Sequence, residues 1–236
     1  MLTNKNLVAF CLRKAAEKTK YMWGDYGRQI TLSTIEGKAK QYPQRYSKSR
    51  IAELKKCVGT HYGCDCVGLI KWFLWTNNGL TPIKYASKTD RNCSSLLRNA
   101  KVSGDIKTLP EIEGLILYKE GHVGVYVGNG KAVECTLGAY GDGVVITNVK
   151  GRGWTKWFML NDIEYIDNRI IKVGDTVTYN GNKHYKSSNG LIPLPCKGGK
   201  ATVTATKLGA KHPYHLVRDK SDGATVYGWV NKEYIL

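Results

Sequence analysis

The segment "GCDCVGL" places a cysteine directly after a residue that caps helices well. Asp65 can accept a hydrogen bond from the first backbone N–H groups of a helix, so Cys66 would occupy the first turn. Unpaired N–H groups and the helix dipole favour a thiolate there, and they can also hold an oxyanion. Gly68 is expected to keep this turn open to an incoming substrate. Cys66 is therefore a candidate nucleophile, although free cysteines are more often buried apolar residues.

A base for such a thiolate is present in the segment "GHVGVYVGNGKAVE". Its alternation predicts a strand in which His122, Gly124 and Tyr126 share one face and the valines share the other. The imidazole would then point away from the apolar side. A single histidine in a strand is more often structural than catalytic, so a third residue has to support this interpretation.

Glu134 is the candidate for that third residue, and its position depends on the turn at Asn129 and Gly130. A strict two-residue turn would put Glu134 on the face opposite to His122. A type I turn with Gly130 as a bulge residue would instead pair Gly124 with Glu134, which makes Glu134 a diagonal neighbour of His122. In the second register the carboxylate can orient the ring and stabilise an imidazolium.

The elements that position these residues follow from the pattern of apolar residues. Residues 4–20 are expected to form a helix capped by Asn4 or Asn6, and another helix should start after Asp65. The polar and basic stretch from 28 to 60 predicts a surface excursion that contains a short helix near 48–57. A further helix is expected at 94–100. From there on, alternating apolar residues predict an antiparallel sheet.

The pattern changes again near Asn168, where we place a domain boundary. Residues 1–168 are expected to form an α+β domain. Short strands separated by Gly, Pro, Asn and Asp then predict a small all-β barrel over residues 169–236.

Charge and cysteine content limit the class of protein. Lys and Arg outnumber Asp and Glu by 36 to 19, mostly within the first 101 residues, so the surface should attract a polyanion such as nucleic acid, anionic lipid or a cell-wall polymer. The seven cysteines show no disulfide spacing, which indicates synthesis in a reducing cytoplasm. The apolar run "LVAFCL" is too short for a signal peptide or a membrane span. A protein of this kind would act outside the cell only after release.

Taken together, "YGCDCVGLI" and "GHVGVYVGNG", with a polar residue twelve positions after the histidine, resemble the papain-like NlpC-type cysteine peptidases that cut peptidoglycan. "TKYMWGDYG" is similar to that family's element upstream of the nucleophile. The resemblance covers roughly residues 7–160. It implies a papain-like α+β fold without metal or cofactor.

The resemblance also implies roles for individual residues. Cys66 would be the nucleophile, His122 the base and Glu134 the orienting residue. Tyr21 would be an accessory residue that binds substrate, and Trp23 and Asp65 are expected to bind substrate beside it.

The C-terminal segment resembles the bacterial Src-homology-three-like cell-wall-binding modules of phage lysins from Gram-positive hosts. Candidates for wall contact or, equally, for the barrel core are Tyr179, Tyr185, Tyr214 and Trp229. The two halves together suggest an endolysin whose partners are peptidoglycan stem peptides and anionic wall polymers, with no nucleic acid and no membrane insertion. The resemblance favours cleavage of the γ-D-glutamyl to diamino-acid bond. The muramoyl to L-alanine amide or a cross-bridge are the alternatives.

Three departures from the family pattern stand out. Val67 occupies a position where the family usually has Ser, Glu134 is a less common orienting residue, and the stretch between Tyr21 and Cys66 is longer than usual. This stretch could form a wall of the substrate groove or contact an anionic polymer.

The sequence is also compatible with other functions. A zinc site could use Cys57, His61, Cys64 and Cys66, although their spacing is not that of a usual zinc knuckle. A binding protein for cell walls or nucleic acid would need no reactive thiol. An acyltransferase would use the same Cys-His pair on another acceptor.

Overall fold

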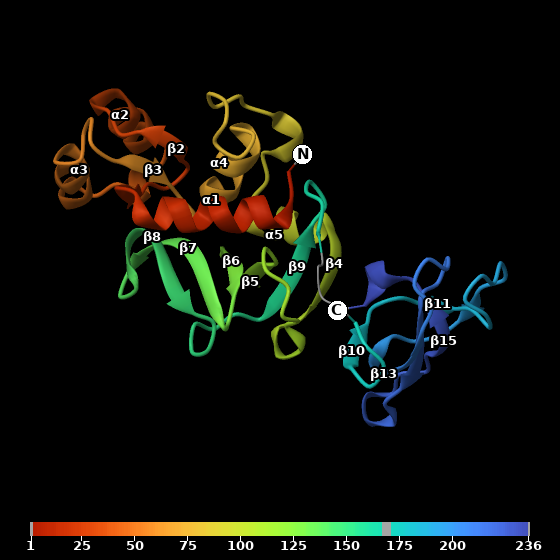
Figure 1. Cartoon of the computed structure of the whole chain (residues 1–236). Coiled ribbons are helices and arrows are strands. Elements are labelled where there is room, and N and C mark those ends of the chain that lie inside the picture. Colours follow the sequence, from red (N-terminus) through yellow and green to blue (C-terminus); the bar gives the residue numbers. More distant parts are fainter. Residues whose placement is uncertain (1, 167–170, 236) are drawn as a thin grey trace. The chain divides into compact units, whose positions relative to one another are not determined.

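A computed structural model describes residues 2–166 and 171–235 of the chain (Figure 1). The chain divides into two compact units, one ending at Ile166 and the other beginning at Asp167. The boundary expected near Asn168 lies on residues 167–170, outside the described residues. Within the described part, no helix is long and apolar enough to span a bilayer.

The first unit combines helices with two sheets. A six-stranded antiparallel sheet has the order β4-β9-β5-β6-β7-β8, and a smaller sheet has the order β1-β3-β2. The helices are α1 (Asn4–Ala16), α2 (Leu32–Gln41), α3 (Lys48–Lys55), α4 (Cys66–Trp75) and α5 (Cys93–Arg98). The strands are β1 (Thr19–Tyr21), β2 (Tyr26–Gln29), β3 (Tyr62–Cys64), β4 (Ala100–Asp105), β5 (Ile116–Lys119), β6 (His122–Gly128), β7 (Lys131–Gly138), β8 (Gly141–Asn148) and β9 (Lys156–Leu160).

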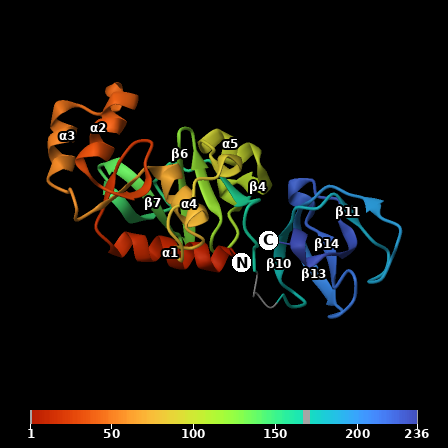
Figure 2. The same cartoon turned by 90° about the horizontal axis from the view of Figure 1, so that it is seen from above.

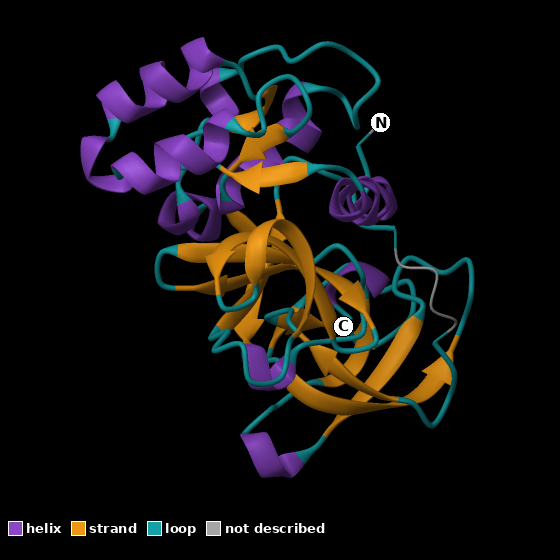
Figure 3. Cartoon of the chain, turned by 90° about the vertical axis from the view of Figure 1, so that its left-hand side faces the viewer, coloured by secondary structure: helices purple, strands orange, loops and turns teal. Residues whose placement is uncertain are grey.

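Helices α1 and α4 lie against the large sheet, where both contact β6 and β7, as two perpendicular views show (Figure 1 and Figure 2). The core between them is built from apolar side chains of both helices and of the sheet. Phe73 of α4 is 0% exposed in this core, so its truncation to Ala is expected to cost about 3–5 kcal/mol. The mixed helix and sheet composition, visible in Figure 3, fits the expected papain-like α+β fold.

Helix α4 forms as the sequence predicts. Asp65 is its N-cap, and the Asp65 side chain accepts a hydrogen bond from the Gly68 N–H at 2.6 Å. Eight of its ten residues are buried, so the helix is embedded on most of its circumference and is fixed by packing. Gly68 has a different role from the one expected. A Cβ on Gly68 would lie 1.9 Å from the Asp25 carbonyl oxygen, so glycine is needed for backbone contact and not for substrate access.

The other expected helices are present with shifted ends. Helix α1 starts at Asn4, but its cap is Thr3, which forms a capping box with Asn6. The expected helix at 94–100 is α5, which begins at Cys93. The basic excursion (residues 28–60) contains the expected short helix α3 and a further helix, α2.

The hairpin of β6 and β7 combines the two registers that the sequence left open: the turn is that of the first, and Gly124 lies opposite Glu134 as in the second. Gly128 pairs with Lys131, so Asn129 and Gly130 form a two-residue turn, with φ of 52° and 67°. The bulge lies one step earlier, because the register shifts between Tyr126 and Gly128. The extra residue lies between Tyr126 and Gly128, and it shifts the pairing by one position. Glu134 therefore lies on the same face of the sheet as His122.

The second unit is built from short strands. Strands β10-β13-β14-β15 form an antiparallel sheet, and β11 and β12 form a separate pair. Its core contains Tyr179 and Tyr214, which are 1% and 5% exposed. The strands are β10 (Thr176–Tyr179), β11 (Lys183–His184), β12 (Leu194–Pro195), β13 (Gly199–Thr206), β14 (Tyr214–Arg218) and β15 (Tyr227–Val230).

Candidate active site

The three residues expected to form a catalytic group come together at the N-terminal end of α4. Cys66 and His122 are close enough that each shifts the pKa of the other, lowering that of the thiol and raising that of the imidazole. On its other side the ring contacts a carboxylate, with His122 Nε2 2.6 Å from Glu134 Oε2. That contact leaves Nδ1 as the ring nitrogen available to the thiol. The order of groups is therefore thiol, imidazole, carboxylate.

Glu134 is completely buried and is held by four hydrogen bonds from three side chains. Arg152 donates from Nε and Nη2, both at 2.7 Å, and the Thr147 hydroxyl donates at 2.6 Å. Burial alone would raise the pKa of Glu134, but the hydrogen bonds from His122, Arg152 and Thr147 outweigh it and lower the pKa to about 2. The carboxylate is therefore ionised at every pH at which the protein is expected to work.

The pKa of the imidazole shifts in the opposite direction, upward. Burial lowers the pKa of His122, but the contacts with Cys66 and Glu134 outweigh this effect and raise it to about 9. The indole of Trp154 stacks on the ring, with centroids 5.6 Å apart and planes 15° apart. Gly124 makes room for this arrangement, since a Cβ there would lie 3.0 Å from the Trp154 ring. The environment thus favours an imidazolium held in one orientation.

A second thiol lies beside Cys66. Cys93 Sγ is 3.8 Å from Cys66 Sγ, and both side chains are buried. The hydrogen bond with Cys93 and burial raise the pKa of Cys66, whereas the contact with His122 lowers it. The pKa of Cys93 is lowered by the same contact with Cys66. The two thiols therefore compete for a proton, and His122 is the group that can remove it from Cys66.

Two pockets flank the Cys66–His122 pair. One of about 410 Å³ is lined by Tyr21, Trp23 and His122 together with residues of the basic excursion. The other, of about 520 Å³, is lined by Cys66, Cys93 and again Trp23. Cys66 therefore lines one of the two pockets and His122 lines the other.

The expected substrate-binding residues all lie at these pockets. Tyr21 lines the pocket beside His122, and burial raises the pKa of its phenol, as do the nearby Cys66 and Asp65. Trp23 lines both pockets. Asp65 lines the second pocket, but its two oxygens accept backbone hydrogen bonds from Gly24 and Gly68 at 2.8 and 2.6 Å. Asp65 therefore ties a loop to the helix, which leaves little of its carboxylate for substrate.

The four residues of the alternative zinc site have separate partners. Cys57 Sγ donates to the Glu53 carbonyl, the His61 ring contacts the Thr60 hydroxyl, and Cys64 Sγ lies 3.4 Å from Cys135 Sγ. Residues 2–166 and 171–235 contain no group of three or more His, Cys, Asp or Glu side chains that could hold a metal ion.

The aromatic residues expected to contact a ligand in the second unit fall into two groups. Tyr179 and Tyr214 are core residues, so the structure does not offer them to a wall polymer. Tyr185 and Trp229 are half-buried and lie at the surface, where Tyr185 stacks on His212 with ring centroids 3.6 Å apart.

Several residues of the site were not found from the sequence. Arg152 and Trp154 lie in the loop between β8 and β9, and Cys93 starts α5, far from the motifs in the chain. Only one signal could have indicated Arg152: a buried glutamate requires a cationic partner, and this is a basic residue in a glycine-flanked loop. Neither Trp154 nor Cys93 has such a signal.

A comparison with protein families matches more than half of the chain. The model of the NlpC/P60 family matches residues 19–162, which span the thiol, the imidazole and the carboxylate. A comparison with curated protein sequences found no match.

Solved structures to which the chain is similar include the peptidoglycan hydrolase RipB from Mycobacterium tuberculosis, at 20% identity and a TM-score of 0.38, covering 69% of this chain and 67% of that one. The P60 domain of an antigen from M. avium subspecies paratuberculosis is 21% identical, with a TM-score of 0.37, over 69% of this chain and 98% of that one. NlpC1 from Trichomonas vaginalis is 16% identical with a TM-score of 0.38, and the match covers 66% of this chain but only 43% of NlpC1.

Proposed function

Because the chain belongs to the NlpC/P60 family, we propose that it is a peptidoglycan hydrolase that cuts stem-peptide amide bonds by a Cys-His-Glu mechanism. The observation that carries this proposal is the contact of His122 with Cys66 on one side and with Glu134, at 2.6 Å, on the other. A buried carboxylate that holds an imidazole against a thiol at a helix N-terminus is the set of groups that thiol peptidases need.

In this mechanism His122 takes the proton of Cys66, and the thiolate attacks the carbonyl carbon of the scissile amide. Backbone N–H groups of the first turn of α4 stabilise the oxyanion. His122 then protonates the leaving amine, and an acyl-enzyme remains on Cys66. Water, deprotonated by His122, attacks the thioester and releases the carboxylate product, so the thiol and the imidazole return to their starting states. Glu134 remains ionised throughout and stabilises the imidazolium.

The bond proposed is the one between the γ-carboxyl of D-glutamate and the diamino acid of the stem peptide. The second unit is proposed to attach the enzyme to the cell wall, with Tyr185 and Trp229 as contact residues, in the manner of a phage endolysin. Under this proposal the protein is made in the cytoplasm and acts on the wall after release, and its basic surface favours anionic wall polymers.

Mass spectrometry of fragments released from purified peptidoglycan tests the reaction and names the bond. The wild type is expected to release peptides with a new amino terminus on the diamino acid, whereas an amidase would release a free amino terminus on L-alanine. Cys66→Ala should release no fragments. Cys196→Ala, which removes a free thiol of the second unit, should match the wild type. Undiminished release by Cys66→Ala would refute the mechanism.

Wall attachment needs a separate measurement. The full chain carrying Cys66→Ala should still co-sediment with purified walls, because its second unit is unchanged. Adding Tyr185→Ala or Trp229→Ala should reduce the sedimented fraction. Equal sedimentation of all three variants would exclude these two residues as wall contacts.

A further inference from the structure

The pocket beside His122 contains two arginines of the basic excursion, and their surroundings differ. Arg45 and Arg50 both line it, together with Tyr21, Trp23 and His122. The excursion thus contributes a wall of the pocket next to the imidazole.

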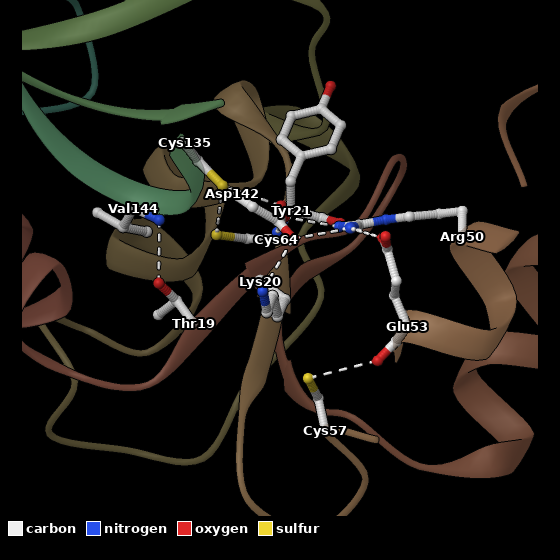
Figure 4. Close-up of polar contacts among 10 residues, drawn as sticks. All are labelled: Thr19, Lys20, Tyr21, Arg50, Glu53, Cys57, Cys64, Cys135, Asp142 and Val144. Carbon is white, nitrogen blue, oxygen red and sulfur yellow. Dashed lines mark hydrogen bonds and ion pairs between the residues drawn. The ribbon is translucent and has the colours of Figure 1, made fainter. Parts of the chain in front are cut away.

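Arg50 is fully engaged within the protein. It is 8% exposed, and its Nη1 and Nη2 atoms each lie 2.7 Å from an oxygen of Asp142. It also donates to Glu53 at 3.1 Å and to the carbonyl oxygen of Tyr21. Figure 4 shows Arg50 between Glu53 and Asp142 beside Tyr21. Arg50 therefore anchors α3 to the strand that carries Tyr21.

Arg45 has no such partner. Its side chain is exposed, and within residues 2–166 and 171–235 no carboxylate lies within 4.0 Å of it and no hydrogen bond reaches its guanidinium. The guanidinium carbon lies 4.0 Å from the centre of the Trp23 ring. Stacking on an aromatic ring occupies the flat face of an arginine and leaves the N–H groups at its edge free to donate.

The backbone holds this stack in place. Arg45 ends the short turn η1 (Pro43–Arg45), and its N–H donates to the Tyr42 carbonyl at 2.9 Å. The next residue, Tyr46, is buried, and its hydroxyl donates to the Trp23 carbonyl at 2.8 Å. The two partners of the stack are therefore linked through Tyr46, so the guanidinium is positioned before any ligand arrives.

We propose that Arg45, stacked on Trp23, is a specificity-determining residue that binds a carboxylate of the stem peptide in the pocket beside His122. This inference rests on the proposed hydrolysis of stem peptides. An arginine fork matches a carboxylate with two parallel hydrogen bonds, and stem peptides carry such groups on either side of the proposed scissile bond. The sources are the α-carboxylate of D-glutamate and the free carboxylate of the diamino acid.

Steady-state kinetics with three synthetic stem peptides test the proposal. One peptide carries both carboxylates, and each of the others has one of them converted to the neutral carboxamide. The wild type should show a higher KM for one of the two amides, which identifies the carboxylate that is bound. Arg45→Gln should raise KM about 10-fold for the peptide with both carboxylates, because a hydrogen bond to a charged group is lost, and leave kcat nearly unchanged.

The peptide that already lacks the recognised carboxylate provides the decisive comparison. Wild type and Arg45→Gln should cut it with the same KM, and Arg45→Lys should restore part of the preference because it keeps the charge without the fork. Lys48→Gln removes an exposed charge from the same excursion and should behave as the wild type on all peptides. An equal rise in KM on every peptide, or none on any, would overturn the proposal.

Binding measured without turnover separates this proposal from the proposed function. Calorimetry with Cys66→Ala and with Cys66→Ala carrying Arg45→Gln should show about 10-fold weaker binding of the peptide with both carboxylates in the second variant. Equal affinities would refute the role of Arg45 even if the wild type is an active hydrolase. If the wild type cuts none of the peptides and none binds, the proposed function fails and the role of Arg45 fails with it.

Discussion

Two arginine–carboxylate clusters lie on the neighbouring strands β7 and β8, and they differ in what else the carboxylate contacts. Glu134 is bound by Arg152 through two hydrogen bonds of 2.7 Å, and Asp142 is bound by Arg50 through two of the same length. Glu134 also contacts the His122 ring. Asp142 instead contacts Lys20 and the backbone N–H of Tyr21.

The comparison shows that the ion pair itself does not define a function. The Glu134 side chain is 0% exposed and touches a group that titrates, so its charge raises the pKa of His122. The Asp142 side chain is 24% exposed and contacts Arg50 of the excursion and the backbone N–H of Tyr21, so it links the excursion to the strand of Tyr21. Variants of the two clusters should therefore affect different kinetic parameters.

The largest effect is expected for Arg152→Ala. It leaves Glu134 buried without its main cationic partner, which should lower the free energy of unfolding by about 3 kcal/mol. The pKa of Glu134 should rise because two of the hydrogen bonds that lower it are lost. Urea denaturation of the full chain measures the stability. Arg98→Ala, on the exposed side of α5, is a control that should be nearly neutral.

Glu134→Gln should mainly reduce kcat, by roughly 10- to 100-fold, because the imidazolium loses the carboxylate that orients it. The pKa of His122 should fall from about 9 toward its ordinary value of 6.5. The pH dependence of Cys66 alkylation and of kcat measures both. An unchanged profile with normal kcat would contradict the role of Glu134.

The same variant should also change how stability depends on pH. Because the pKa of Glu134 is low, the ionised carboxylate stabilises the fold above about pH 4.5. This contribution is lost as the pH falls toward about 2. Because the pKa of His122 is raised, the imidazolium stabilises the fold fully below pH 6.5. This contribution is lost as the pH rises through about 9. The wild type should therefore exceed Glu134→Gln in stability most clearly between about pH 4.5 and 6.5.

Asp142→Asn should have a smaller effect of another kind. Arg50 loses a charged partner but keeps Glu53 and the Tyr21 carbonyl, so the expected loss of stability is about 1–2 kcal/mol. We expect KM to rise about 3- to 10-fold with kcat nearly unchanged, because the excursion holds the pocket wall less firmly. Limited trypsin digestion should cut the excursion faster than in the wild type. A fall in kcat with constant KM would contradict the distinction between the clusters.

The smallest effect is expected at the second thiol. The hydrogen bond with Cys93 is the main cause that raises the pKa of Cys66, so Cys93→Ala should shift the alkylation of Cys66 to lower pH. Peptide mass spectrometry after brief iodoacetamide treatment measures modification at Cys66 alone. Cys196→Ala is the matched control and should leave the profile in place.

Much of the site was accessible from local sequence patterns. The N-cap at Asp65 and the alternation around His122 depend on residues a few positions apart, so helix and strand periodicity predict them. Whether His122 and Glu134 lie on the same face of the sheet was harder to predict, because one extra residue in the hairpin reverses the face of Glu134. The bulge lies at Val127 and not in the turn, and turn chemistry alone could not place it.

The sequence by itself determined that a thiol would lie at the start of a helix and that an imidazole would leave the apolar face of a strand. Only the tertiary structure decided that Arg152 neutralises Glu134, that Cys93 contacts Cys66 and that Arg45 is free while Arg50 is not. The physical reason is the separation along the chain of the residues that interact. Capping and alternation act within one element, whereas the burial of a charge and the choice of its partner depend on which distant segments the core brings together.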